Sequence, residues 1–446
     1  LVFLRPLGLR LGGAFGPQTM REPEYPDLKP DDPNRTVKYE PIPLLEGEDN
    51  PSLTEATAVA NFISTEYADG ADTLTLCFDI GGSTTDISAL YRLRSGLTMV
   101  KQNSMRFAAQ LVSGAVSKLP RFQNALLNIC SKYKIPMVGL NVGAGGSRYS
   151  SETAPYFFDK IVDRLTTEQL ADFYQIIEVE CPELMYVNMY VTGLLMYYAG
   201  QISRKLVEDI ARTDPNEKIS RSPRTLVRVT FAGKGSQLFS WLATTHAKTA
   251  QSYYVQLFTQ GFGGPQPLKA MLSNWPQIML PHSISDDTKF EVSKGLAKGD
   301  TRLYRPMDDT ISEIVGEEGF TVTTGRGNGE QVPLPAFNTF TPEMMSVMGV
   351  LFNPPAGPNQ APCFFDFAGT FYNAGANILG INDTMNAIKD GIKRINIVQY
   401  AQNQPEFREA KQAAEANNAK FDYVVPVIIL EGMKFYDTLL EILSHR

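Results

Sequence analysis

The chain has 446 residues, of which 43% are hydrophobic and 20% are charged. This balance is typical of a globular protein, and the length corresponds to two or three domains. The formal net charge of −7 argues against a general affinity for nucleic acid or anionic lipid, and no apolar run is long enough to span a bilayer.

Cysteine and histidine are too scarce and too scattered to suggest metal centres. The three histidines, His246, His282 and His445, offer little material for metal or base chemistry. The cysteines form no C-x-x-C pair, so neither a zinc site nor a disulfide framework is indicated. We expect four reduced, buried thiols in a cytoplasmic protein, namely Cys77, Cys130, Cys181 and Cys363.

The N-terminal part is rich in proline and charge over residues 16–50, and we expect one strand in it, at 36–45. A helix is predicted at 51–63, opened by Ser52 or Thr54, with Glu55 in its first turn. The chain begins with a leucine and lacks a signal-peptide pattern, and we expect it to be a piece of a longer protein.

The middle of the chain alternates between strand and helix patterns. We expect strands at 73–78, 87–93, 97–102 and 226–231, and helices from 106 onward, at 159–179, 185–212, 237–258 and 287–298. Further along, we expect a hairpin within 314–337, helices at 383–396 and 406–419, and a last helix from about Gly432.

The first candidate site is the sequence Asp-Ile-Gly-Gly-Ser-Thr-Thr-Asp at residues 79–86, between two predicted strands. Adjacent glycines let the backbone approach a phosphate, and consecutive N–H groups form an anion-binding concavity. A Gly-Gly hairpin turn is the alternative, but it needs neither the aspartates nor the hydroxyl groups. We predict that the nucleotide contacts Gly81, Gly82, Ser83, Thr84, Thr85 and Asp86, and that Asp79 holds Mg²⁺ through water.

The second candidate site connects strand 226–231 to the following helix. Its residues are Gly233, Lys234, Gly235 and Ser236. Glycines at such a junction let the backbone lie against a flat or anionic ligand. The alternative is a plain connection in which Ser236 caps the helix.

Taken in order, these segments resemble the nucleotide domain shared by actin, the seventy-kilodalton heat-shock chaperones, bacterial actins and sugar kinases. Residues 79–88 are similar to the second phosphate motif of that superfamily, in its chaperone form. Residues 227–236 are similar to the adenosine motif, with Lys234 where a second glycine is usual. Residues 54–58 and 287–297 resemble two further segments, so the resemblance covers roughly residues 36–299.

The resemblance implies an α/β fold, the mixed sheet flanked by helices of the actin-like (ribonuclease-H-like) ATPases. Residues 1–50 would hold the end of a first lobe, 51–299 the second-lobe nucleotide-binding domain, and 300–446 a C-terminal α+β extension with a hairpin and helices. It further implies ATP and Mg²⁺ as cofactors, with Glu55 and Asp79 as the catalytic residues and Glu55 helping to position the attacking water.

The function implied is a nucleotide-dependent conformational switch, chaperone-like or reactivase-like, that hydrolyses ATP in the full-length protein. Its partners would be ATP or ADP and a protein client or further copies of itself. An actin-like filament protein and a small-molecule kinase stay open as alternatives. The first phosphate motif of the family is not found, so we expect an N-terminal truncation, weak ATP binding and negligible hydrolysis. We also expect Gly233→Val to weaken adenine-nucleotide binding with the fold intact.

Overall fold

The computed structural model describes a central body and several short strands outside it. The described residues are 19–21, 40–42, 73–93, 98–135, 150–213, 219, 225–272, 276–281, 304–306, 321–323, 331–333, 351–353, 363–379, 408, 412 and 426–445.

A six-stranded mixed sheet lies at the centre of the body, in the strand order β7-β6-β3-β4-β5-β8. The pairs β3–β4 and β4–β5 are antiparallel, whereas β6 runs parallel to both β3 and β7, and β8 parallel to β5. The predicted α/β class with a mixed sheet is confirmed. The strands are β3 (Thr73–Ile80), β4 (Thr85–Arg92), β5 (Thr98–Met105), β6 (Leu226–Ala232), β7 (Gln277–Met279) and β8 (Tyr304–Pro306).

The two neighbouring strands β3 and β6 share an apolar face because their side chains alternate. Leu74, Leu76, Phe78 and Ile80 of β3 are fully buried on it. Val227, Val229 and Phe231 continue this face in β6. Burial of each such side chain stabilises the fold by about 1.5–3 kcal/mol.

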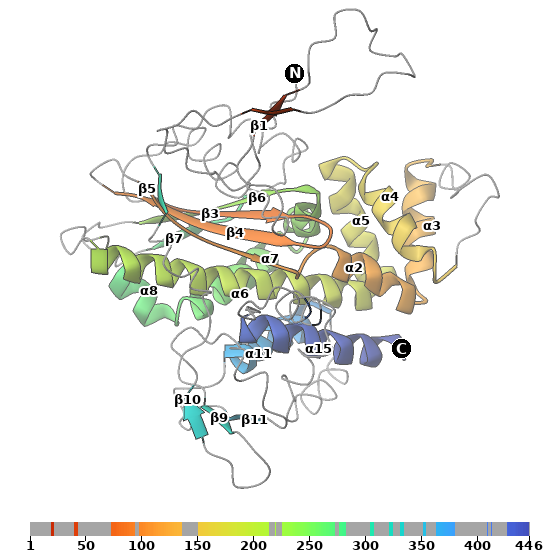
Figure 1. Ribbon diagram of the computed structural model, residues 1–446. Coiled ribbons are helices and arrows are strands. Elements are labelled where there is room, and N and C mark those ends of the chain that lie inside the picture. Colours follow the sequence, from red (N-terminus) through yellow and green to blue (C-terminus); the bar gives the residue numbers. More distant parts are fainter. Residues whose placement is uncertain are drawn as a thin grey trace, which may run out of the picture.

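Helices cover this apolar face. Figure 1 shows α6, α7 and α8 along one side of the sheet, with α2 to α5 grouped at one end. The helices are α2 (Gln110–Ala115), η1 (Val116–Lys118), α3 (Phe122–Lys132), α4 (Ala154–Val162), α5 (Thr167–Glu180), α6 (Pro182–Thr213), η4 (Lys234–Ala243), α7 (Ala247–Gly261), α8 (Pro265–Met271), α11 (Cys363–Leu379) and α15 (Val427–Ser444).

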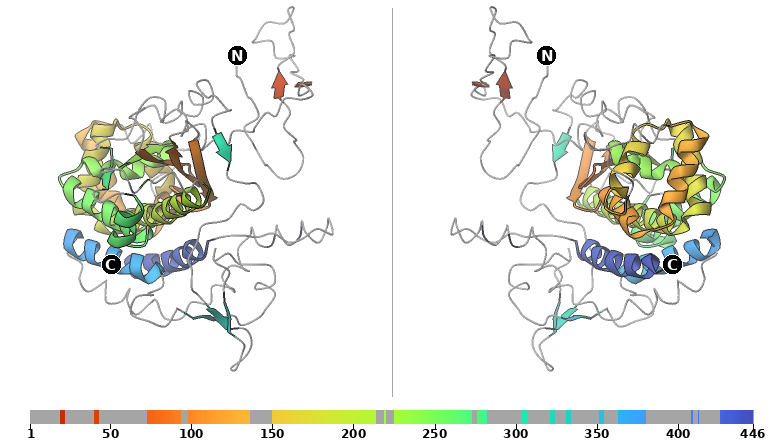
Figure 2. Two further views of the ribbon diagram at one scale, coloured as in Figure 1. Left: turned by 90° about the vertical axis from the view of Figure 1, so that its left-hand side faces the viewer. Right: turned by 90° about the vertical axis from the view of Figure 1, so that its right-hand side faces the viewer.

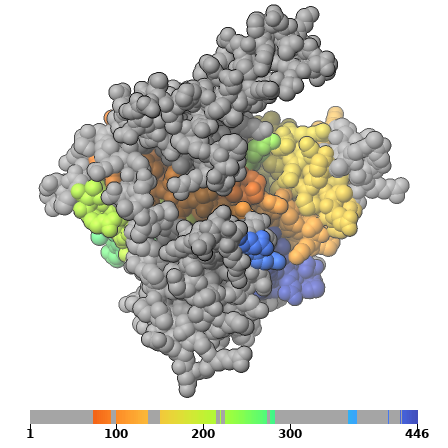
Figure 3. All heavy atoms as spheres, in the orientation of Figure 1, coloured from red at the N-terminus to blue at the C-terminus, as the bar shows by residue number. Residues whose placement is uncertain are grey.

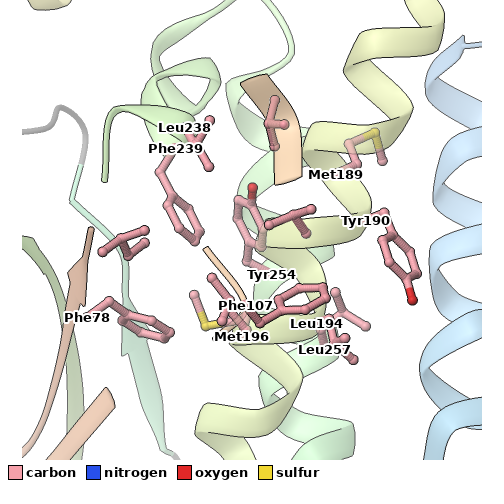
Figure 4. Packing of buried hydrophobic residues seen from close by; sticks show 14 of the residues in the cluster. Phe78, Phe107, Met189, Tyr190, Leu194, Met196, Leu238, Phe239, Tyr254 and Leu257 are labelled. Carbon is pink, nitrogen blue, oxygen red and sulfur yellow. The ribbon is translucent and has the colours of Figure 1, made fainter. Parts of the chain in front are cut away.

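Aromatic side chains fill the space between sheet and helices (Figure 4). The ring of Phe239 lies 6.1 Å from that of Phe78 and 5.1 Å from that of Tyr254, measured between centroids. The Tyr254 hydroxyl accepts a hydrogen bond from Trp241 Nε1 at 2.5 Å and lies 2.7 Å from Thr192 Oγ1, so the buried polar atom is satisfied. Four tyrosines at helical spacing belong to this core and are buried, namely Tyr197, Tyr198, Tyr253 and Tyr254.

Two predicted long helices are each divided into two elements. The prediction at 159–179 merged α4 with α5, which are separated where Thr166 begins a new helix with a reciprocal capping box to Gln169. The prediction at 237–258 merged the 3₁₀ helix η4 with α7. Between these, Thr244 is extended and its hydroxyl accepts a hydrogen bond from the His246 amide.

The C-terminal helices α11 and α15 pack against α6, and α11 also contacts α7 (Figure 2). Phe367 and Phe371 of α11 and Phe435 and Leu439 of α15 belong to the same hydrophobic cluster as the sheet. The core is therefore shared across the predicted boundary at residue 300. The last helix begins at Val427, five residues before the predicted start at Gly432.

Smaller strands partly match the expectations for the two ends of the chain. In the N-terminal part, β2 (Glu40–Ile42) lies in the predicted strand at 36–45 and pairs with β1 (Thr19–Arg21). In the C-terminal part, β9 (Thr321–Thr323) and β10 (Gln331–Pro333) pair antiparallel inside the predicted hairpin, and β11 (Leu351–Asn353) pairs with β9.

Several expectations fall outside the described residues. These are the helices at 51–63, 287–298 and 383–396 and nearly all of the helix at 406–419. Cys77, Cys130 and Cys181 are buried and form no disulfide, as expected. Within the described ranges, no helix has the length and apolar character that a bilayer crossing requires.

Candidate functional site

The two glycine segments lie next to each other at one edge of the sheet. Strands β3 and β6 run parallel, and Asp79 is paired with Ala232 at their carboxyl ends. The first loop (residues 81–84) follows β3, and the second loop (residues 233–236) follows β6. Ligands of open α/β sheets commonly bind outside the carboxyl ends of the strands, which is where both loops lie.

The first loop is a tight turn with an exposed tip. The Gly81 amide donates a hydrogen bond to the Thr84 carbonyl at 2.8 Å, which closes the turn between β3 and β4. Gly82, Ser83 and Thr84 are exposed. Their backbone amides make no hydrogen bond within the part of the chain that the structure describes.

The N-terminus of α2 orients this loop. The Gln110 amide donates to the Gly82 carbonyl at 2.7 Å, and the Ala109 amide to the Gly81 carbonyl at 3.4 Å. These bonds satisfy helix amides that no side chain caps. Because the C=O and N–H of a trans peptide point in opposite directions, the amides of Gly82 and Ser83 point away from α2.

Thr85 differs from the rest of the predicted phosphate residues. Its side chain is fully buried, and its hydroxyl donates to the Phe107 carbonyl at 2.8 Å. The hydroxyl therefore holds the start of β4 against the segment before α2 and is not available as a donor to a phosphate. Ser83 and Thr84 keep their hydroxyl groups at the exposed tip.

The second loop packs directly on the first. Gly233 has φ +73° and ψ 155°, a backbone conformation that is essentially restricted to glycine. A Cβ on Gly233 would lie 2.4 Å from Asp79 Oδ1 and 2.5 Å from the Ile80 carbonyl oxygen. A Cβ on Gly235 would lie 2.7 Å from the Gly81 carbonyl oxygen. The second-loop glycines thus allow close contact between the two loops, and Gly233→Val would disturb the fold as well as any ligand.

Two carboxylates face each other beneath the first loop. Asp79 and Asp86 are direct partners across the antiparallel pair β3–β4, so both side chains point to the same side of the sheet. Burial raises the pKa of Asp86, and a hydrogen bond from the Ser104 side chain partly lowers it. Like charges placed opposite each other favour the binding of a cation between them.

This pair fits Mg²⁺, which commonly takes one or two protein carboxylates and completes its shell with phosphate oxygens and water. Among the described residues, no cluster of three or more acidic, histidine or cysteine side chains forms a complete metal site.

The remaining predicted residues have separate positions. Lys234 is exposed and pairs with Asp163 at the end of α4, with Nζ 2.6 Å from Oδ1. Ser236 is fully buried inside η4, and Gly233 takes the N-cap position, so the alternative in which Ser236 caps the helix is wrong. Glu55 lies outside the described residues.

Four contacts of the site were not expected from the sequence. They are the amides of Ala109 and Gln110 on the first loop, the Ser104 hydrogen bond to Asp86, and the ion pair of Asp163 with Lys234. Only the Asp79–Asp86 pairing had a signal in the sequence, since a four-residue turn between two strands fixes their register.

Comparison with protein-family models finds none that matches this chain, and comparison with curated proteins finds no similar sequence.

Proposed function

We propose that the chain binds ATP with Mg²⁺ at the two packed loops and works as a nucleotide-dependent conformational switch. The observation that carries the proposal is the contact between the loops. Gly233 and Gly235 lie against Asp79, Ile80 and Gly81 so closely that a Cβ at either position would overlap with these residues. A hairpin turn and a strand-to-helix connection that serve only to join elements need not touch each other. A ligand site built from both loops needs them in contact.

The first loop supplies the phosphate donors in this proposal. Gly82, Ser83 and Thr84 offer three consecutive exposed backbone amides, and two of them also offer a hydroxyl group. Charge-assisted hydrogen bonds to such donors contribute about 1.5–3 kcal/mol each. The bonds from α2 fix the loop carbonyls on the opposite side, so the donors are oriented before the ligand arrives.

Asp79 and Asp86 supply the carboxylates for Mg²⁺, and the second loop supplies backbone for the adenosine part, as the resemblance to the chaperone motifs implies. Bound Mg²⁺ neutralises charge on the phosphates. For hydrolysis, the resemblance implies that Glu55 positions the attacking water. The described residues would orient the phosphates at the first loop and supply the negative charge of Asp79 and Asp86 for Mg²⁺.

A hydrogen-bond path supports a switch in preference to the other two functions. The first loop accepts bonds from the first turn of α2, and the Leu111 carbonyl in that turn accepts a bond from Tyr436 of α15. Figure 3 shows the C-terminal helix in blue beside the orange atoms of this region. A change in the peptide orientation of the first loop would therefore reach a helix more than 300 residues away in the sequence.

Isothermal titration calorimetry with ATP, ADP and GTP, with Mg²⁺ and with EDTA, tests the proposal. We expect saturable binding of adenine nucleotides that is strengthened by Mg²⁺. A change in limited proteolysis on binding, without sedimentation at high protein concentration, would support the switch. Nucleotide-dependent pelleting would instead indicate a filament protein, and ATP consumption that requires a small acceptor molecule would indicate a kinase. Absence of any nucleotide binding would refute the proposal.

A further inference from the structure

An ion pair connects the second loop to the end of a neighbouring helix. Lys234 Nζ lies 2.6 Å from Oδ1 of Asp163, and the two side chains are 48% and 37% exposed. Asp163 is the C-cap residue of α4, and α4 packs against α2, whose first turn holds the first loop. The pair therefore lies beside the candidate site and is open to solvent.

Asp163 is in an unfavourable place for a negative charge. The C-terminus of a helix carries the negative end of its dipole, which repels a carboxylate. Asp159 lies one turn earlier on the same helix, and like charges four residues apart destabilise a helix. Burial and the charge of Asp163 raise the pKa of Asp159, whereas Lys160 and Lys234 act in the opposite direction. The positive charge of Lys234 thus offsets the negative charges of Asp159 and Asp163. Lys160 lies over the ring of Tyr156.

Lys234 is close enough to serve the first loop instead. The preceding residue, Gly233, would place a Cβ 2.4 Å from Asp79 Oδ1, so the Cα of Lys234 lies within about 8 Å of that carboxylate. A lysine side chain extends about 6 Å from Cα to its ammonium group. A change of side-chain rotamers alone can move the charge from α4 towards a phosphate bound at the first loop.

We propose that Asp163 is an internal competitor for the polyphosphate of the ligand, and that Lys234 exchanges Asp163 for the ligand on binding. This inference rests on the proposed function, because it assigns a role to residues at the same site. An exposed ion pair contributes only about 0.2–1 kcal/mol, so a ligand that carries several negative charges displaces Asp163 readily. The pair lowers the affinity for the ligand and keeps Lys234 ordered beside the empty site.

A double-mutant cycle with two ligands tests the exchange. Binding of Mg-ATP and of inorganic tripolyphosphate is measured by calorimetry for the wild type, Asp163→Asn, Lys234→Met and the double variant. The control is the exposed ion pair between Lys132 and Asp172 on α3 and α5, where Lys132→Met and Asp172→Asn make the same charge changes away from the loops. Thermal unfolding verifies that every variant is folded.

We expect Asp163→Asn to tighten binding by up to about fivefold, Lys234→Met to weaken it by about tenfold, and Asp163→Asn to have no effect when Lys234 is already methionine. The control variants should change the affinity less than about twofold. Equal tightening by Asp163→Asn with or without Lys234, or no tightening at all, would overturn the inference.

The two ligands separate this inference from the proposed function. If the wild type binds ATP but the double-mutant cycle shows no coupling between Asp163→Asn and Lys234→Met, the proposed function stands and the exchange is refuted. If tripolyphosphate binds as tightly as ATP, and the variants change its affinity as expected, the exchange is supported and adenine recognition is refuted. If the wild type binds neither ligand, both proposals are wrong.

Discussion

The first and the second glycine loop differ in what surrounds their glycines. At Gly82, in the first loop, an added Cβ would meet no atom within 4 Å, and the residue is exposed. In the second loop, an added Cβ on Gly233 would meet backbone atoms of Ile80, at the end of β3, at less than 3 Å, and one on Gly235 would meet the carbonyl oxygens of Ile80 and Gly81 at less than 3 Å. The first loop thus presents its backbone to solvent and a ligand, while the second loop supports it from behind. The same residue type therefore serves binding in one place and packing in the other.

The largest effect that this comparison predicts is on stability. Gly233→Ala combines a forbidden backbone conformation with a steric overlap, and we expect it to lower the free energy of unfolding by about 2–6 kcal/mol. Gly82→Ala is the matched control and should change it by less than about 0.5 kcal/mol. Urea denaturation of both variants measures the difference. Similar stabilities for the two variants would mean that the loops are not packed as described.

The next effect concerns Mg²⁺. We expect Asp79→Ala to weaken binding of Mg-ATP by about ten- to a hundredfold, because the carboxylate that helps hold the ion is lost. Binding of ATP in EDTA should change little, since Asp79 offers no donor to a phosphate. Calorimetry with and without Mg²⁺ separates the two cases. An equal loss under both conditions would show that Asp79 supports the loops rather than the ion.

The smallest effect is a pH dependence of stability. Burial raises the pKa of Asp86, so the folded state favours the protonated carboxyl group. At pH values above the raised pKa, the charged Asp86 carboxylate therefore lowers the free energy of unfolding. This loss disappears as the pH falls from the raised pKa to the ordinary pKa of an aspartate. We expect Asp86→Asn to be more stable than the wild type at neutral pH and to lose this pH dependence, as followed by urea denaturation between acidic and neutral pH.

Asp172 provides a control of opposite sign for the Asp86 experiment. Hydrogen bonds from Lys132 and Tyr133 lower the pKa of this carboxyl group, so its contribution to stability is present above the ordinary value and is lost as the pH falls through the lowered one. Asp172→Asn should therefore reduce stability at neutral pH. If both variants shift stability in the same direction, the assignment for Asp86 is wrong.

Local patterns in the sequence predicted the parts of the site that depend on neighbouring residues. The strands on either side of the first loop, and the strand β6, follow from the patterns of apolar residues in the sequence. The division between α4 and α5 also had a local signal, since Thr166 and Gln169 form a capping box, but the apolar periodicity on either side obscured it.

Contacts between distant segments could not be predicted in this way. Lys234 and Asp163 are separated by 71 residues, and Tyr436 and Leu111 by 325. No periodicity encodes which helix end faces which loop, because that depends on how the whole core packs. The same holds for α11 and α15, whose apolar faces pack on α6 although hundreds of residues separate α15 from α6 in the chain.

Hydrogen exchange resolved by mass spectrometry tests most directly whether the two loops form one nucleotide site. We predict that Mg-ATP slows exchange together in peptides that cover residues 81–84 and residues 233–240, while α8, away from the loops, exchanges as before. Slower exchange at the first loop alone would leave the second loop as a packing element only. Unchanged exchange at both loops under saturating nucleotide would contradict the account.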